Sequence, residues 1–348
     1  MRAPQFSNLH AVWCASWVLL WTFAATGAAQ TVPAGDSLKI VMCGTSGPLA
    51  VRDRAKPCVA VQAGGALYLI DIGPEATENL MLWRLPLATA RAVFITHLHS
   101  DHIGGLGEFN MQSWVAGRSA PLAVVGPGGV DKLAAGFNLA YETDHAFRRA
   151  HHEHGDVTLP TGAGLLSSTI VVMPGPSEPP SRHVAPAWSQ AGLTVTAIEV
   201  EHSPVSPAFA YRFDYKGRSV VISGDTRKWP PLAEAARGAD VLIHEAQNSD
   251  MTRLLASTLS GAGQARQASI MTDTLSYHTT PVEAAEIAKA AGVKVLILSH
   301  LTQAGLPFFT PDAFTRGVDA VFTPWRLARD GMTIELPVGT TEIRYGQF

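Results

Sequence analysis

The chain has 348 residues, of which 47% are hydrophobic and 16% are charged. That composition supplies enough apolar side chains for a sizeable core and too little charge for a disordered chain. The formal net charge is −3 with the histidines neutral, so the chain lacks the overall basic surplus that is typical of nucleic-acid-binding proteins. Length alone allows one or two domains.

The first thirty residues predict a secretory signal peptide. Arg2 is the only charged residue before Asp36, and the apolar run "AVWCASWVLLWTFAATGAA" that follows it ends in small residues. These are the parts of a cleavable signal, and an uncleaved membrane anchor is the alternative. We expect cleavage after Ala29, which makes 1–29 the signal peptide and 30–348 a periplasmic or secreted domain. No later stretch has transmembrane length, so we expect no membrane contact after cleavage.

Two cysteines, Cys43 and Cys58, remain in the expected mature chain. They lie at the end of one apolar run and at the start of the next. In an oxidising compartment they could form a disulfide. Two buried free thiols are an equal alternative, because the sequence does not give the distance between them.

Short strands and helices follow one another along the rest of the chain. Strands are expected over 38–44, in a hairpin over 58–73 that turns at Gly64 and Gly65, and over 90–100, 121–129, 193–202, 208–215, 219–225, 239–246 and 293–300. Helices are expected over 77–85, 130–154, 229–238 and 280–292. Residues 159–190 are rich in Pro, Gly and Ser and predict an excursion from the regular elements. We find no linker, so two β-rich halves covered by helices are expected to form one domain.

Four titratable residues crowd into the six positions 97–102, directly after an apolar run. They are His97, His99, Asp101 and His102. If the strand continues through "ITHLH", the first two histidines share one face. Nitrogen and carboxylate ligands suit zinc or a similar divalent metal. One ion does not need four ligands from one segment, so the crowding indicates two ions with further ligands elsewhere.

The second half of the chain offers those further ligands at the ends of apolar runs. They are His202, Asp225, His244 followed by Glu245, and His300. Ligands at strand ends lie on rigid elements that can converge on one edge of a sheet. Several such ends, together with the first cluster, predict a metal site rather than a set of core positions.

These motifs resemble those of the metallo-β-lactamase superfamily. "THLHSDH" is similar to the HxHxDH signature, and "EHSPVSPAFAYRF", "SGDTR", "HEA", "YHTTP" and "LILSH" follow in the family's order. The resemblance extends from about residue 38 to the C-terminus. It implies a mixed α/β (α+β) fold, a four-layer αββα sandwich with a dinuclear site between its sheets that binds two Zn²⁺ per chain.

By motif, the resemblance also implies the roles of the site residues. One zinc would be held by His97, His99 and His202, and the other by Asp101, His102 and His300, with Asp225 bridging. A hydroxide shared by the two ions would attack the ester. His278 in "YHTTP" would protonate the leaving oxygen, since its counterpart in ribonuclease Z serves near the scissile bond. Glu245 or His244 would orient His278 or a ligand. The expected catalytic residues are thus His278, Asp101 and Glu245.

The substrate is expected to be a small-molecule sulfate or phosphate ester. "THLHSDHIGGLGEF", "AFAYRFDYKGRSVVISGDTR" and "DAVFTPWRLARDGM" resemble the arylsulfatase-like members of the superfamily. "YHTTPVEAAEIA" and the intact Asp225 are similar to the branch that holds these enzymes and ribonuclease Z. True β-lactamases generally have a cysteine at that aspartate.

A phosphodiesterase of the ribonuclease Z kind, which processes tRNA 3′ ends, is the alternative. Bacterial versions carry a long arm for tRNA between the third histidine motif and the bridging aspartate. Here His202 and Asp225 are only 23 positions apart, so we expect no nucleic-acid partner. A lactonase is a further possibility. A metal-binding module without catalysis is disfavoured by the intact ligand set and His278. The oligomeric state stays open, a homodimer included.

Two weaker signals leave alternatives open. The histidines of "DHAFRRAHHEH", which are His145, His151, His152 and His154, could form a third metal site or a substrate rim, but a solvated helix end is the preferred interpretation. The insertion 249–276 could form a hydrophobic lid over the site or pack against the sandwich.

Overall fold

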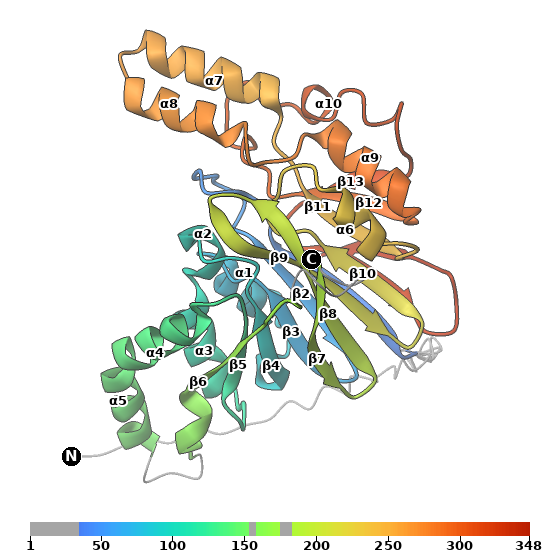
Figure 1. The fold of residues 1–348 in the computed structure, drawn as a ribbon. Helices are drawn as coiled ribbons and strands as arrows, with labels where there is room; N and C mark the ends of the chain where they lie inside the picture. Colours follow the sequence, from blue (N-terminus) through green and yellow to red (C-terminus); the bar gives the residue numbers. More distant parts are fainter. Residues whose placement is uncertain (1–34, 153–157, 175–182) are drawn as a thin grey trace, which may run out of the picture. The chain divides into compact units, whose positions relative to one another are not determined.

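The strands of Asp36–Phe348 form two sheets that pack face to face (Figure 1). The computed structural model describes residues 35–152, 158–174 and 183–348, so the predicted signal peptide over 1–29 lies outside the described residues. In spatial order the first sheet comprises β15 (Arg344–Gln347), β14 (Met332–Pro337), β1 (Ser37–Gly44), β2 (Cys58–Ala63), β3 (Ala66–Ile70), β4 (Ala90–Phe94), β5 (Leu122–Gly126) and β6 (Leu166–Ile170). The second comprises β13 (Trp325–Leu327), β12 (Val295–Ser299), β11 (Val241–Glu245), β10 (Arg218–Ile222), β9 (Val205–Tyr215), β8 (Leu193–His202) and β7 (Val184–Gln190).

Helices cover the outer face of each sheet. The helices that follow strands of the first sheet are α1 (Ala76–Leu82), α2 (Ser100–Ile103), α3 (Leu106–Val115), α4 (Val130–Ala140) and α5 (Glu142–His152). The second half contributes α6 (Pro230–Ala235), α7 (Ser249–Gly261), α8 (Ala265–Thr274), α9 (Pro281–Ala291) and α10 (Pro311–Phe314). Figure 1 shows α7 and α8 as a hairpin at the upper end of the sandwich. The predicted αββα sandwich, one domain, is confirmed.

Burial on both faces explains why the central strands are almost wholly apolar. In β1, Leu38 and Ile40 pack into the core between the sheets, while Val41 packs under the helices of the first half. In β12, Ile297 faces the core between the sheets and Leu296 faces the helices of the second half. Side chains alternate between the faces of a strand, so each sheet stabilises two apolar layers at once.

Parallel pairing brings the carboxyl ends of the strands to one end of the sandwich. In the first sheet β3, β4, β5 and β6 run parallel, and in the second β10, β11, β12 and β13 do. Side chains that follow these strands therefore lie near one another across the two sheets. This arrangement positions the site.

The sequence predicts the hairpin turn, whereas it leaves the pairing of the two cysteines open. The hairpin between β2 and β3 turns at Gly64 (φ 57°) and Gly65 (φ 76°), and a two-residue turn with positive φ at both positions favours glycine there. Cys43 at the end of β1 and Cys58 at the start of β2 are joined by a disulfide. Of the two alternatives, a disulfide or two free thiols, the structure therefore contains the disulfide.

The expected excursion over 159–190 is in part wrong. It contains two strands, β6 and β7, each of which lies at one edge of its sheet. Each pairs through its backbone with one neighbour, and four of the five β6 side chains are exposed. A strand with so little to bury needs no apolar pattern, which is why composition did not reveal it.

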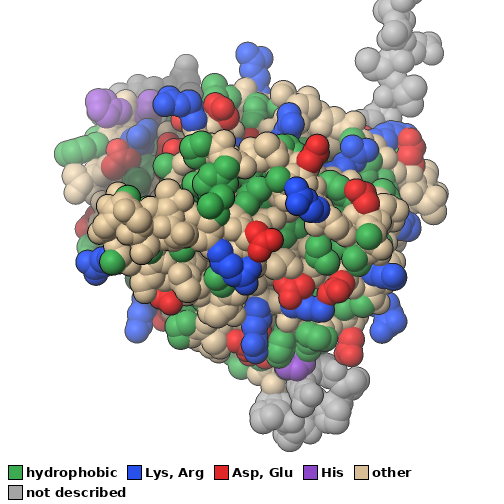
Figure 2. Space-filling model, turned by 90° about the horizontal axis from the view of Figure 1, so that it is seen from above, with side chains coloured by type: hydrophobic (Ala, Val, Ile, Leu, Met, Phe, Trp, Pro, Cys, Tyr) green, Lys and Arg blue, Asp and Glu red, His purple; other side chains and the backbone are tan. Residues whose placement is uncertain are grey.

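Two surface properties bear on partners. Within the described residues, no helix is both long and apolar enough to cross a bilayer. Seen from above, basic and acidic side chains of the described residues are interspersed rather than gathered by sign (Figure 2).

Candidate active site

The predicted ligands converge at the carboxyl ends of strands from both sheets. His97 follows β4 by three residues, and His202 is the last residue of β8. Asp225 follows β10 by three residues, and His300 comes directly after β12. All four are at least 95% buried. Their convergence follows from the parallel register of the strands that carry them.

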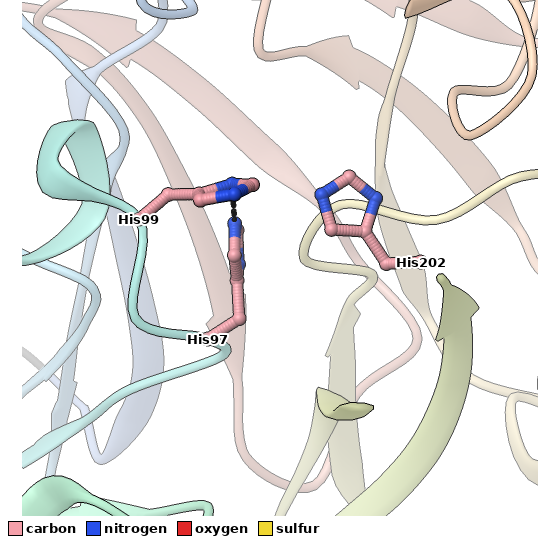
Figure 3. Close-up of side chains that lie close together, drawn as sticks. All are labelled: His97, His99 and His202. Atoms are coloured by element: carbon pink, nitrogen blue, oxygen red, sulfur yellow. Dashed lines mark hydrogen bonds between the residues drawn. The ribbon is translucent and has the colours of Figure 1, made fainter. Parts of the chain in front are cut away.

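Three histidines form the first group. His97, His99 and His202 each offer a ring nitrogen within 4.8 Å of the others. Figure 3 shows the rings of the first two meeting, with His97 Nε2 2.8 Å from His99 Nδ1, and His202 facing them from the other sheet. The assumption that the strand after residue 90 continues through His99 is wrong, because β4 ends at Phe94. The loop that follows turns the two rings toward the same point instead.

Asp101, His102 and His300 form the second group. Asp101 Oδ2 lies 3.6 Å from Nε2 of His102 and 3.6 Å from Nε2 of His300. Asp225 lies between the two groups, because its Oδ2 is 3.9 Å from His97 Nε2, 3.4 Å from His102 Nε2 and 3.3 Å from His300 Nε2. The structure thus brings together all seven residues that were expected to hold metal.

The donor atoms in these groups fit metal ions. The Nε2 atoms of His102, His202 and His300 and the Oδ1 of Asp225 are buried and have no hydrogen-bond partner among the described residues. Buried polar atoms normally have a partner, so a cluster of such atoms needs one that the protein does not supply. Burial lowers the pKa of His97 and of His202, which keeps both rings neutral with a lone pair to donate. Imidazole and carboxylate donors suit zinc and similar divalent metals.

Asp71 supports the site and was missed in the sequence. Its Oδ2 lies 2.7 Å from Nδ1 of His102, and its two oxygens accept hydrogen bonds from the backbone N–H and the hydroxyl of Thr96, both at 2.8 Å. A carboxylate on Nδ1 favours the tautomer that turns a free Nε2 toward the ligand site. The signal was present, because Asp71 ends the apolar run of β3 just as Asp225 follows that of β10.

His202 is oriented in the same way. Its Nδ1 donates to the backbone carbonyl of Tyr277, at 3.1 Å, which leaves Nε2 for the site. Tyr277 immediately precedes His278, so the segment that carries the predicted proton donor also fixes a predicted ligand.

His278 and Glu245 form a buried pair beside the ligands. His278 Nδ1 lies 2.9 Å from Glu245 Oε1, and that oxygen also accepts from the backbone N–H groups of Thr226 (3.0 Å) and Thr279 (3.3 Å). Burial by itself would lower the pKa of His278. The Glu245 carboxylate has the larger, opposite effect and raises this pKa to about 9 in the metal-free chain. Of the two predicted orienting residues, Glu245 makes the contact. His244 instead binds the carbonyl of Glu245 through Nδ1, at 2.8 Å.

The site opens into a cavity of about 260 Å³. Its floor includes His99, Asp101, Asp225 and His278, and its walls include residues of α7 and α8. The insertion 249–276 was expected either to cover the site or to pack against the sandwich. The structure supports the first alternative, because the insertion forms a wall of this cavity.

The histidines of α5 lie apart from this cluster. His145 packs edge-on against Trp114, with ring centroids 5.1 Å apart, while His151 and His152 are exposed. Among the described residues none of them belongs to a group that could hold a metal. His154 lies outside the described residues. The solvated helix end remains the preferred interpretation.

Comparison with known proteins identifies the family. The model of the family described as "Beta-lactamase superfamily domain" matches residues 67–301, a range that contains every predicted ligand. This chain belongs to the metallo-β-lactamase superfamily. The ribonuclease Z of Mycobacterium bovis (strain BCG / Pasteur 1173P2) is 33% identical over 270 residues, which are 77% of this chain and 87% of the relative.

Solved structures agree on the fold of this superfamily member. The short form of human tRNase Z has a TM-score of 0.59 at 22% identity, and a metallo-β-lactamase fold protein from Bacillus subtilis has a TM-score of 0.58 at 19% identity. Each match covers 86% of this chain and 100% of the other. The predicted superfamily is confirmed, and the relatives favour the ribonuclease Z-like alternative over the arylsulfatase-like hydrolase that we inferred first.

Proposed function

We propose that this chain is a metal-dependent hydrolase of phosphodiester bonds. The observation that carries the proposal is the position of the Asp225 carboxylate between two groups of side chains that could hold metal, 3.3 to 3.9 Å from a nitrogen of each. The ribonuclease Z relative adds the bond type, because it matches most of this chain.

Zinc is the metal that we propose, with two ions per chain. His97, His99 and His202 would hold one ion, Asp101, His102 and His300 the other, and Asp225 would be shared. When bound, such ions lower the pKa of water toward neutrality and offset the negative charge that develops on phosphate oxygens.

The residues of the chain supply the proton for the leaving group. Glu245 holds the Nδ1 proton of His278, so Nε2 is the nitrogen left for the substrate. The pKa of about 9 keeps His278 protonated at neutral pH in the metal-free chain. As the oxygen of water bonds to phosphorus and the ester P–O bond breaks, His278 Nε2 gives its proton to the departing oxygen. The proton that water releases returns His278 to its acid form.

A substrate panel tests the bond type. Zinc-loaded protein is assayed with bis(4-nitrophenyl) phosphate, 4-nitrophenyl sulfate, 4-nitrophenyl phosphate and a lactone, and His97→Ala serves as the blank. We expect the highest kcat/KM with the phosphodiester. A preference for the sulfate would favour the arylsulfatase-like alternative and overturn the proposal.

We also propose that the chain is exported and cleaved after Ala29. The Cys43–Cys58 disulfide supports this, because disulfides persist in oxidising compartments. The measurement is the intact mass of protein recovered from the periplasmic and cytoplasmic fractions of a bacterial host. A periplasmic chain that begins at Gln30 is the expected result, and a full-length cytoplasmic chain with free thiols would contradict it.

A further inference from the structure

We propose that the substrate is a phosphodiester that carries a single phosphate and an uncharged, largely apolar substituent, bound by the α7–α8 hairpin. This inference rests on the proposed function and specifies what the site accepts. It differs from a polynucleotide substrate, for which the ribonuclease Z relative is named.

The first observation is the apolar wall beside the ligands. Leu255 of α7 and Ile270 and Met271 of α8 line the cavity, and Leu49 lines it from the loop after β1. Ile270 is 49% exposed although it is large and apolar. Apolar surface that lines a cavity next to reactive groups is the usual contact for the non-reacting part of a small substrate.

The second observation concerns charge. Over the ranges that the structure describes, the lining of this cavity includes no lysine or arginine, and its carboxylates are those of Asp101 and Asp225. A polynucleotide carries a phosphate at every nucleotide, and proteins that bind one neutralise several of them with basic side chains. One phosphate could lie over the metal centre, but the cavity has no cation for a second.

Acidic side chains and ion pairs lie on the surface next to the site. A neighbouring cavity beside His202 is lined by Glu199 and Glu201. Two nearby cations form ion pairs, since Arg253 Nη1 lies 3.1 Å from Asp250 and Lys228 Nζ lies 2.5 Å from Glu286. Figure 2 shows the same interspersion over the upper face. A neutral substituent suits these surroundings better than a polyanion does.

The third observation is that the wall is anchored at its base. Gln247, which is 3% exposed, donates from Nε2 to the hydroxyls of Thr252 in α7 (3.0 Å) and Thr274 in α8 (2.7 Å). Gln303 donates to the same Thr252 hydroxyl at 2.7 Å. Gln247 and Gln303 follow β11 and β12, which also carry residues of the site. Their hydrogen bonds therefore fix the position of α7 and α8 relative to the metal ligands.

The test compares two diesters that share one leaving group, phenyl 4-nitrophenyl phosphate and methyl 4-nitrophenyl phosphate, in the zinc-loaded full protein. We expect a lower KM for the phenyl diester by about tenfold or more, because the ring removes more apolar area from water. Leu255→Gln should raise KM for the phenyl diester by a larger factor than KM for the methyl diester, so the ratio of the two KM values should move toward one. Leu254→Gln is the matched control, since Leu254 lies on the same helix, is 51% exposed and does not line the cavity.

A binding measurement separates this inference from the proposed function. Calorimetry with phenylphosphonate and methylphosphonate reports on the wall without turnover, and we expect the phenyl compound to bind tighter in the wild type and in Leu254→Gln but not in Leu255→Gln. Met271→Gln replaces Leu255→Gln if the latter does not fold by circular dichroism. An unchanged phenyl-to-methyl ratio in the variants, or a single-stranded RNA cleaved with a higher kcat/KM than the phenyl diester, would overturn the inference. If neither diester is cleaved but the phosphonate preference holds, the proposed function fails and the apolar subsite stands.

Discussion

Asp225 owes its chemistry to the residues that surround it. Burial by itself would raise the pKa of its carboxyl. The nearby His300 and His102 together have the larger, opposite effect and hold the pKa well below its usual range, so the group is an anion at neutral pH. An anion among imidazole nitrogens that can donate lone pairs is the arrangement that two cations would stabilise. Around it, Asp71, the backbone carbonyl of Tyr277 and Glu245 each accept a hydrogen bond from one histidine and orient its ring.

Asp71 gives the first prediction. Asp71→Asn keeps the size of the side chain but removes the charge that fixes the tautomer of His102. We expect zinc affinity to fall by about 10- to 100-fold, the usual effect of losing an outer partner of a metal ligand. The measurement is competition with a fluorescent zinc chelator, and an affinity equal to that of the wild type would contradict the role given to Asp71.

The second prediction concerns His278. His278→Ala should lower kcat for the phosphodiester by about 100-fold or more, because general acid catalysis contributes on that order. Metal content should stay at the wild-type level. Since His278 also lies within 4.8 Å of donor atoms of Asp225 and His300, a loss of metal in this variant would make it a ligand instead of a proton donor.

The third prediction concerns the pH dependence of the hydrolysis rate. Glu245 raises the pKa of His278, and the acid form of His278 is the form that donates a proton. The rate should therefore fall as pH rises through the pKa of His278. In Glu245→Gln the raising influence is gone, so this fall should occur at lower pH than in the wild type. Superimposable alkaline limbs of log kcat against pH in the two proteins would refute the coupling.

At the scale of elements, the loop between β1 and β2 connects the disulfide to the site. Cys43 and Cys58 are fully buried at its two ends, and Leu49 within it lines the cavity. The fourth prediction follows from this closure. Replacing both cysteines with serine opens a loop with a sequence separation of 15, and we expect the free energy of unfolding to fall by about 3 kcal/mol. Urea denaturation measures it, with the reduced wild type as the control, and an unchanged midpoint would show that the bond does not constrain the fold.

Some elements could be predicted from the sequence and others could not, for physical reasons. β1 and β12 are buried on both faces, so their apolar runs identify them. β6 exposes four of its five side chains and pairs with β5 through its backbone, so "LSSTI" carries no pattern. The helices over 249–276 show an apolar stripe whether they cover the cavity or the sandwich, so their place could not be inferred.

The same contrast holds for the site. The ligands follow apolar strands and match a family motif, which made them predictable. Asp71 also ends an apolar run, but it contacts His102 across 31 positions, so the residues near "LIDIG" do not show which side chain it supports.

At the scale of the whole molecule, the metal centre joins the two sheets. The loop after β4 supplies His97, His99, Asp101 and His102, whereas strands of the other sheet end at or just before His202, Asp225 and His300. Each group therefore takes ligands from both halves. Ligands that bind the folded state alone stabilise it by about 4 kcal/mol at a thousandfold excess over Kd. Metal should accordingly raise the unfolding temperature of the sandwich as one unit.

The most direct measurement is a zinc titration of the chelator-treated protein, with bound metal counted by mass spectrometry and hydrolysis of bis(4-nitrophenyl) phosphate followed in parallel. We expect the metal-free chain to be inactive and to unfold at a lower temperature. Activity should return in proportion to zinc and reach its plateau at two ions per chain. Phosphodiester hydrolysis that persists without metal, or two bound ions with no hydrolysis of the diester, would contradict a dinuclear phosphodiesterase.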